Sequence, residues 1–429
     1  MAAAVEGGAA PACSGKKRKR AASGLADLHD DMLERVLARL PPATYFRLRG
    51  VSRRWRAAAG SNTFRAACAR VPARDPWFLM LEDPAALQDQ QQLPAPRHAA
   101  AVFDSAERAW ARWSGAPGPV PVAAAGGLML YRDAATGDLT VVNPLTGASR
   151  ALPPPPPPSS SNALQAIAMY GSPYRVVLIL GELPDDLSMA SFDSTTNAWE
   201  GPVALTRKTE DEDGEASPSP ERGAEEEGEA AGGDDTVYFL SKSGDVVATT
   251  MQRSASRQYS SAVACRAGGA GGGEEDEAVA YFLSRSGTVV ACDLARRAFT
   301  ELPRILPAYH EYSIDVVSCG AAAYAVVLSE FLDTASLRVW EHAGGAWRQV
   351  AAMPPAMSHA FRGAKADVNC VGHGGRVMVC VSSGDAAARG CFMCDVATNR
   401  WEELPPRAGG DATGFVAALS FEPRMEAAV

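Results

Sequence analysis

The sequence lacks the features of a membrane-spanning or secreted protein. It has no run of 18 apolar residues, so no segment is predicted to cross a membrane as a helix. Its first residues have no basic stretch ahead of an apolar one, so no secretory signal is expected. The nine cysteines are odd in number and scattered, which is typical of reduced thiols in the cytosol or nucleus. These absences argue against the membrane, secreted and disulfide-scaffold classes.

Motifs for catalysis are also missing. The six histidines form no pair at metal-ligand spacing, and no Gly-x-Ser-x-Gly, Walker or dinucleotide-binding motif occurs. Cys391 and Cys394 form a CxxC motif without a second ligand pair, so they are predicted to be structural thiols. The chain is therefore predicted to be no enzyme and to hold no cofactor or metal. An enzyme with copper or zinc is an alternative that metal analysis would test.

Positive charge is in the minority. The chain has 41 Lys and Arg against 50 Asp and Glu, a net charge of −9 at pH 7, which argues against a general nucleic-acid binder. One arginine cluster, at 47, 49, 53, 54 and 56, is interleaved with Phe46 and Trp55 and could be a nucleic-acid patch. We favour its assignment to the helical segment described below, because the chain is acidic overall.

Composition divides the chain into three parts. Residues 1–24 are rich in Ala and Gly and are expected to be a disordered tail. Residues 25–70 have helical periodicity. Residues 75–429 consist of short apolar runs separated by Gly, Pro, Asn and Asp, which predicts strands in series. The tail contains a candidate nuclear-import signal, formed by Lys16, Lys17, Arg18, Lys19 and Arg20. The expected location of the protein is the nucleus, the cytoplasm or both.

Three segments of the strand-rich part are predicted to be disordered insertions. Residues 153–161 are six prolines and three serines, and residues 209–235 carry twelve carboxylates and one arginine. Residues 268–277 form a third loop of Gly and Glu. Ser217 and Ser219 each precede a proline in the acidic insertion and are candidate phosphorylation sites.

The strand-rich part also repeats itself. Residues 392–405 contain a strand, Asp395, a turn, Trp401 and a Leu-Pro exit, and related units occur upstream. The predicted turns lie at 104, 143, 193, 250, 293, 341 and 395, between 39 and 57 residues apart. A period of about fifty residues with four short strands is typical of a kelch-type β-propeller. We favour seven blades, with six as the alternative, and expect residues 415–421 to pair with residues 77–81 and close the ring.

The N-terminal segment is too short to bury a self-sufficient core. Residues 28–40 place apolar side chains on one face of a helix, which Pro41 and Pro42 end. Since the segment has only some 45 residues, its apolar face is expected to need a partner.

This segment resembles an F-box, the motif that docks a Skp-type adaptor within cullin-RING ubiquitin ligases. The matching residues are Leu28, His29, Asp31, Met32, Leu33, Val36, Leu37, Leu40, Pro41, Val51, Ser52, Arg53, Trp55 and Arg56. His29 stands where the family usually has Pro. The resemblance implies that the adaptor is contacted by Leu28, Asp31, Met32, Leu33, Val36, Leu37, Leu40, Pro41, Val51 and Trp55. From about residue 25 onward, the chain resembles the plant F-box/kelch-repeat proteins.

The resemblance implies a function. The chain would be the substrate-recognition subunit of a Skp–cullin–F-box ubiquitin ligase, with cullin and RING subunits reached through the adaptor. Its propeller would bind a target protein for ubiquitination and proteasomal degradation. The alternative is a non-degradative nuclear scaffold or interaction module built on the propeller. The target and the propeller residues that bind it do not follow from the sequence.

Overall fold

The fold is known from a computed structural model, in which the chain divides into two compact units, Met1–Val71 and Pro72–Val429. The structure describes residues 28–50, 52–58, 60–82, 99–114, 119–156, 163–183, 186–208, 236–240, 246–250, 261–266, 277–284, 287–306, 312–331, 334–364, 366–383, 389–407 and 415–429. Several sequence predictions lie outside these residues: the tail 1–24 with its basic run 16–20, Val51, residues 157–161 of the proline-rich insertion, the insertion 209–235, and residues 268–276 of the predicted loop 268–277. Its last residue, Glu277, begins a strand instead.

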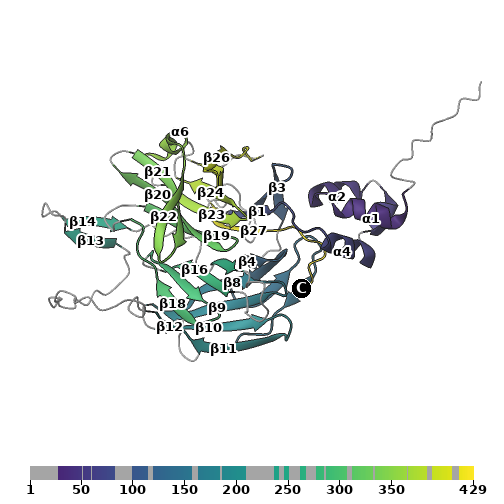
Figure 1. Ribbon diagram of the computed structural model, residues 1–429, viewed down its shortest axis with the longest axis horizontal. Coiled ribbons are helices and arrows are strands. Elements are labelled where there is room, and N and C mark those ends of the chain that lie inside the picture. Colours follow the sequence, from purple (N-terminus) through teal and green to yellow (C-terminus); the bar gives the residue numbers. More distant parts are fainter. Residues whose placement is uncertain are drawn as a thin grey trace, which may run out of the picture. The chain divides into compact units, whose positions relative to one another are not determined.

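The first unit is helical. Its elements are α1 (Asp30–Ala38), α2 (Pro42–Leu48), α3 (Arg53–Ala58) and α4 (Asn62–Ala69) (Figure 1). Asp30 and Asp31 lie in the first turn of α1, where the helix dipole favours negative charge. Ser61 caps α4 by accepting a hydrogen bond from the Phe64 amide at 3.0 Å.

The core of this unit joins α1, α2 and α4. The side chains of Leu33, Leu37, Tyr45 and Phe64 are at most 1% exposed. The Tyr45 and Phe64 rings stack with centroids 5.2 Å apart. The Ser61 hydroxyl also donates to Glu34 of α1 at 2.8 Å. These contacts make α1 an integral part of the unit with one side facing inward.

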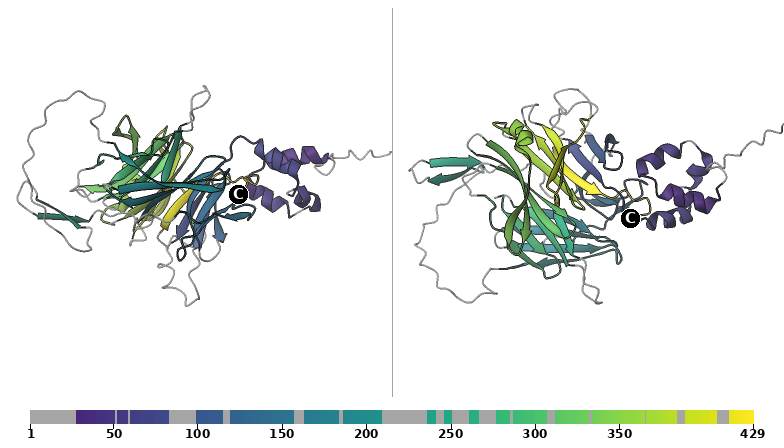
Figure 2. Two further views of the ribbon diagram at one scale, coloured as in Figure 1. Left: turned by 90° about the horizontal axis from the view of Figure 1, so that it is seen from below. Right: turned by 45° about the horizontal axis from the view of Figure 1, so that its top comes forward.

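The second unit is a β-propeller. Within the described residues it has six blades, each with four antiparallel strands (Figures 1 and 2). In blades 2 to 6 these strands follow the sequence from the centre outward, whereas blade 1 begins with the last strand of the chain. Blade 1 consists of β27 (Phe415–Phe421), β1 (Trp77–Glu82), β2 (Ala99–Asp104) and β3 (Ala109–Ser114). Blade 2 consists of β4 (Val120–Ala125), β5 (Leu128–Arg132), β6 (Leu139–Val142) and β7 (Ser149–Ala151), and blade 3 of β8 (Leu164–Tyr170), β9 (Arg175–Glu182), β10 (Asp186–Asp193) and β11 (Ala198–Ala204). Blade 4 consists of β15 (Ala262–Arg266), β16 (Glu277–Leu283), β17 (Val289–Asp293) and β18 (Ala298–Glu301), with the short β12 (Thr206–Arg207) added in parallel outside β18. Blade 5 consists of β19 (Tyr312–Cys319), β20 (Ala322–Phe331), β21 (Thr334–Ala343) and β22 (Ala346–Ala352), and blade 6 of β23 (Asp367–His373), β24 (Arg376–Ser382), β25 (Gly390–Asp395) and β26 (Arg400–Glu403).

The ring is closed by the last strand, and the predicted closure is confirmed. β27 pairs antiparallel with β1, with Trp77 opposite Phe421 and Leu79 opposite Leu419. Blade 1 therefore combines strands from the two ends of the second unit. β27 covers the edge of β1, and blade 1 then ends on an inner strand as the other blades do.

Within the described residues the propeller has six blades, the number expected as the alternative to the favoured seven. The turn expected at Thr250 ends a separate two-stranded sheet, β13 (Thr236–Leu240) with β14 (Val246–Thr250). In this hairpin Tyr238 pairs with Ala248, as Tyr281 pairs with Ala291 in blade 4. The hairpin thus shares the sequence and register of two middle strands of a blade. Among the described residues no inner or outer strand pairs with it, so it does not make up a four-stranded blade.

The repeated aspartate and asparagine residues form the turns between the third and fourth strands. Their side-chain oxygens accept backbone N–H groups two or three residues ahead, which fixes a tight turn. The pairs are Asp104 and Ala106 (2.9 Å), Asn143 and Leu145 (3.0 Å), Asp193 and Thr195 (2.7 Å), Asp293 and Arg296 (2.9 Å), and Asp395 and Thr398 (2.9 Å). A hydrogen bond from the Thr398 hydroxyl lowers the pKa of Asp395. The predicted turns at these five positions are confirmed.

The repeated tryptophans join neighbouring blades. In three cases the indole N–H of a fourth strand donates to the carbonyl of the proline that ends the preceding blade. The pairs are Trp110 and Pro405 (2.7 Å), Trp199 and Pro153 (2.8 Å), and Trp347 and Pro303 (2.9 Å). The Trp and Leu-Pro parts of the repeat are therefore two halves of one contact between blades.

Replacing Trp199 by Phe tests this contact. The variant retains a large ring but cannot donate to Pro153, so we expect the propeller to lose about 1–2 kcal/mol of unfolding free energy in urea titrations. Trp401→Phe is the matched control, because the Trp401 indole bonds Asn399 of its own blade at 3.1 Å. An equal loss in both variants would contradict the inter-blade role.

The strands of the propeller end at two opposite faces, and the connections between strands are grouped by the face at which they begin. Since adjacent strands are antiparallel, turns between first and second strands share one face with turns between third and fourth strands. Apart from residues 267–276, these are short connections such as 126–127 and 374–375. We name this the turn face. At the other face, the loop face, lie the strand ends that the connections between blades and between second and third strands join, among them the ends of β1 and β2, β11 and β15, and β26 and β27.

The ends of the second unit meet at the turn face, where the tail 422–429 follows β27. The fully buried Asn143 amide donates to the carbonyls of Arg424 (3.0 Å) and Ala427 (2.8 Å). The Arg424 guanidinium donates to the Pro72 carbonyl at 3.0 Å and pairs with Glu422. Asn143 therefore serves both a turn and the attachment of the tail, a second role that its place in the repeat did not indicate.

Candidate functional site

The first candidate surface is the solvent side of α1. Met32 is 47% exposed and Val36 41%, the most exposed large apolar side chains described in this unit. Arg35 and Arg39 are exposed as well. Positions 32, 35, 36 and 39 are three or four residues apart, so they share one face of the helix. We name these four residues the α1 outer face.

The structure places some of the predicted adaptor-binding residues in the core of the unit and leaves others accessible to solvent. Leu33 and Leu37 are each 1% exposed and belong to the core of the unit. The predicted residues that remain accessible are Met32, Val36 and Asp31, which are exposed, and Leu28, Leu40, Pro41 and Trp55, which are half-buried. Val51 lies outside the described residues. The periodicity that grouped 33 and 37 with 36 could not show which side of the helix the other helices cover.

The N-terminus of α1 is held by α3. The Arg54 guanidinium donates to the Asp30 carboxylate at 2.7 Å and also to the Leu28 carbonyl. Asp31 accepts a hydrogen bond from His29, which lowers the pKa of its carboxyl. Sequence reasoning had linked the arginine cluster to nucleic acid or to the third helix of the motif. The structure shows that Arg54 orders the start of α1.

The surface of the helical unit is strongly basic. Its described residues carry nine arginines and three carboxylates. Each carboxylate has a partner within the unit: Asp30 with Arg54, Asp31 with His29, and Glu34 with Ser61. Eight of the nine arginines are exposed, and the Arg49 guanidinium lies 4.6 Å from the centre of the Phe46 ring. The described residues of the unit therefore carry more arginines than their own carboxylates can neutralise.

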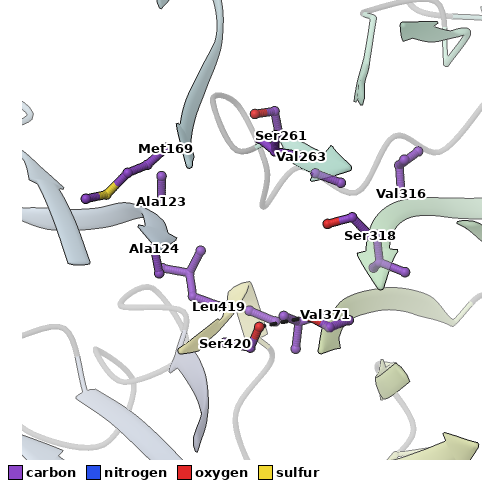
Figure 3. Close-up of a pocket in the computed structure, with 14 residues that line it drawn as sticks. Ala123, Ala124, Met169, Ser261, Val263, Val316, Ser318, Val371, Leu419 and Ser420 are labelled. Atoms are coloured by element: carbon purple, nitrogen blue, oxygen red, sulfur yellow. Dashed lines mark hydrogen bonds between the residues drawn. The ribbon is translucent and has the colours of Figure 1, made fainter. Parts of the chain in front are cut away.

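A second candidate site is a cavity at the centre of the propeller (Figure 3). Its volume is about 120 Å³, and its lining comes from the innermost strands and the residue that precedes β15: Ala123, Ala124, Met169, Ser261, Ala262, Val263, Val316, Val317, Ser318, Val371, Gly372, Ala418, Leu419 and Ser420. Two of its hydroxyls connect neighbouring blades, since Ser261 donates to Ile167 and Ser420 to Gly372, each at 2.9 Å. No lining side chain titrates or carries charge. Its only polar side chains are the hydroxyls of Ser261, Ser318 and Ser420.

The CxxC motif does not form a ligand pair. Cys391 faces Cys380, with sulfur atoms 3.0 Å apart, whereas Cys394 packs in the core formed by blades 5 and 6. Burial raises the pKa of Cys394 to about 12, so its reactive thiolate form is scarce. Among the described residues, no group of three or more His, Cys, Asp and Glu side chains is placed to hold a metal ion.

None of the described helices combines the length and apolar character needed to cross a bilayer. Two surfaces are candidates for binding, the α1 outer face and the loop face of the propeller.

Comparison with known proteins assigns the family. Residues 25–66 match the F-box domain. The chain is 39% identical over 420 residues to F-box only protein 13 of Arabidopsis thaliana, covering 94% of this chain and 85% of that protein. It is 28% identical over 178 residues to F-box only protein 6 of the same plant, covering 39% and 35%. Among solved structures, TolB of Acinetobacter baumannii aligns with a TM-score of 0.41 and 10% identity over 86% of this chain and 73% of that one. The resemblance found in the sequence is thereby confirmed, and the chain belongs to the plant F-box proteins, with a helical F-box followed by a β-propeller.

Proposed function

We propose that this chain is the substrate receptor of a Skp–cullin–F-box ubiquitin ligase. The F-box binds a Skp-type adaptor, which connects the chain to cullin and RING subunits. The propeller binds a target protein, whose lysines are then held close to a ubiquitin-conjugating enzyme at high effective concentration. The chain contributes binding rather than catalysis.

The observation that carries this proposal is the exposed apolar pair Met32 and Val36. The helix α1 already uses its other side for the core, through Leu33 and Leu37. Exposed apolar side chains with a defined helical spacing are typical of helix docking into an apolar groove. Their position within the matched F-box segment supports the adaptor as the partner.

The loop face of the propeller is the proposed target-binding surface. Long connections tolerate sequence change and carry specificity, while the strands keep the scaffold rigid. The turn face has short connections and also holds the tail and Pro72, the first residue of the second unit. The longest connections therefore lie on the face opposite to the one where the chain enters the propeller.

The adaptor interaction is tested with Met32→Asp combined with Val36→Asp. Two carboxylates replace side chains that bury apolar area on binding, so we expect affinity for a plant Skp-type adaptor to fall at least about 100-fold in calorimetry. Phe331→Asp is the control, because Phe331 is an exposed apolar residue of the propeller at 56%. Unchanged adaptor binding by the double variant would overturn the proposal.

The degradative role needs a second measurement. Proteins captured by the propeller should accumulate when the proteasome is inhibited, and they should accumulate in cells that express only the Met32→Asp, Val36→Asp chain. Captured proteins whose turnover is the same under both conditions would favour the alternative, a non-degradative interaction module.

A further inference from the structure

Two cysteines of blade 6 lie directly opposite each other on neighbouring strands. Cys380 of β24 pairs with Cys391 of β25 in the antiparallel ladder, and their sulfur atoms are 3.0 Å apart. Both are thiols in the structure. Residues that face each other in such a ladder have Cα atoms about 4.5 or 5.5 Å apart, and a disulfide spans about 4.4–6.8 Å between Cα atoms. The backbone therefore already has the spacing that a disulfide needs.

The two thiols lie on the side of blade 6 that faces blade 1. The thiol of Cys380 donates to the sulfur of Met80 in β1 at 3.6 Å. Phe78 of β1 and Ala418 of β27 belong to the same buried cluster, against which Cys391 packs. Since β27 closes the ring by pairing with β1, the cysteine pair lies at the contact between the first and last blades. We name this contact the closing seam.

The two cysteines differ in their access to solvent. Cys391 is half-buried, whereas Cys380 is 0% exposed. Burial raises the pKa of the Cys380 thiol, so this thiol stays protonated and does not react directly with an oxidant from solution. Cys391 can meet such an oxidant, and Cys380 is then within reach of the oxidised sulfur. An accessible cysteine beside a resolving cysteine is typical of redox-sensitive pairs.

We infer that Cys380 and Cys391 form a reversible disulfide when the chain meets a peroxide, and that this bond fastens β24 to β25 at the closing seam. The Cys391 thiolate attacks one oxygen of hydrogen peroxide and the O–O bond breaks, which gives a sulfenic acid and a hydroxide that takes up the proton lost by the thiol. The Cys380 sulfur then attacks the Cys391 sulfur, so that the S–S bond forms and the S–O bond breaks. The leaving hydroxide takes the proton of Cys380. In total, two thiols lose two electrons and one peroxide becomes two waters.

The bond forms without a large movement. The two sulfur atoms need to approach by about 1 Å, from 3.0 Å to the length of an S–S bond. The disulfide closes a loop of twelve residues, 380–391, and such a closed loop restricts the unfolded chain. We therefore expect oxidation to raise the midpoint of urea unfolding by roughly 0.5–1 M. This expectation does not depend on the proposed ligase role.

Peptide mapping of the full chain tests for the bond. Trypsin separates Cys380 from Cys391, because it cuts after Arg389 and yields the peptides 377–389 and 390–400. The chain is treated with hydrogen peroxide, and the remaining thiols are then alkylated in denaturant before digestion. We expect the two peptides to be joined in most chains and to separate when dithiothreitol reduces the disulfide.

Two variants are compared with the wild type, each before and after oxidation. Cys391→Ala removes the accessible thiol, so it should show neither joined peptides nor a rise of the urea midpoint on oxidation. Cys265→Ala is the matched control. It removes another half-buried thiol, whose partner in the ladder is Ala278, and it should respond to oxidation as the wild type does.

Each outcome supports the inference or overturns it. Joined peptides and a higher midpoint, both lost in Cys391→Ala and both kept in Cys265→Ala, support it. If the peptides are still joined in Cys391→Ala, the bond uses Cys394 and the proposed pair is wrong. Joined peptides without a higher midpoint would contradict the fastening of the closing seam. Unjoined peptides in the oxidised wild type, with or without oxygen on the Cys391 sulfur, would overturn the disulfide.

Discussion

Removing residues 415–429 is expected to abolish cooperative folding of the propeller. These residues contain β27, the innermost strand of blade 1, and its removal leaves β1 without an inner neighbour. Leu419 and Phe421 are 8% and 2% exposed, and the Phe421 ring packs against Trp77 with centroids 6.0 Å apart. Truncating one buried phenylalanine costs about 3–5 kcal/mol. Loss of the whole strand, with its backbone pairing, therefore exceeds the net stability of most domains, which is about 5–15 kcal/mol.

The truncation is measured by circular dichroism and urea unfolding. We expect no cooperative transition from the shortened chain and aggregation through the open edge of β1. The control ends after Phe421, so it retains β27 and loses only residues 422–429. This control leaves the amide of Asn143 without its two carbonyl acceptors and should lose roughly 2–4 kcal/mol while still folding. A normal transition from the chain that lacks residues 415–429 would show that closure by β27 is not needed.

Leu33→Asp is expected to unfold the helical unit. Leu33 is 1% exposed in the core of this small unit, and an unpaired carboxylate there costs more than a unit of four short helices can offset. Adaptor binding should disappear together with amide protection of α1 and α4 in hydrogen exchange. The loss would then report on folding rather than on a contact surface.

Met32→Asp is the matched comparison for Leu33→Asp. The two residues are adjacent, and the substitutions introduce the same charge, but Met32 is 47% exposed. Met32→Asp should keep the amide protection of the helices and lose only the adaptor. Equal protection in the two variants would show that Leu33 is not part of the core.

The turns of the propeller follow from the sequence because their chemistry is local. Asp193 and Asp395 accept hydrogen bonds from backbone N–H groups within three residues. The residues that predict the turn are therefore the same residues that form it. The inter-blade bond from Trp199 to Pro153 joins residues 46 positions apart. The sequence shows both as parts of a repeat, but only the ring arrangement brings the tryptophan of one unit to the proline of the preceding unit.

The blade number and the exposed side of α1 could not be predicted for a related reason. The residues around Thr250 carry the sequence of two middle strands, yet a blade also needs inner and outer strands that come from distant parts of the chain. In α1, periodicity assigns Leu33 and Val36 to the same broad apolar face of the helix. Packing of α1 against α4 then decides that Leu33 faces inward while Val36 stays exposed. Both decisions depend on tertiary contacts that a pattern of single residues does not contain.

Ring closure by β27 also affects the order of events during synthesis. β1 ends at Glu82 and its inner partner begins at Phe415, so at about 5–20 residues per second the edge of β1 waits on the order of 20–70 s on the ribosome. During that time the helices α1–α4 have already been made, whereas the propeller cannot close. The helical unit can therefore fold well before the propeller can close. Until β27 is made, the edge of β1 stays open to pairing with other strands.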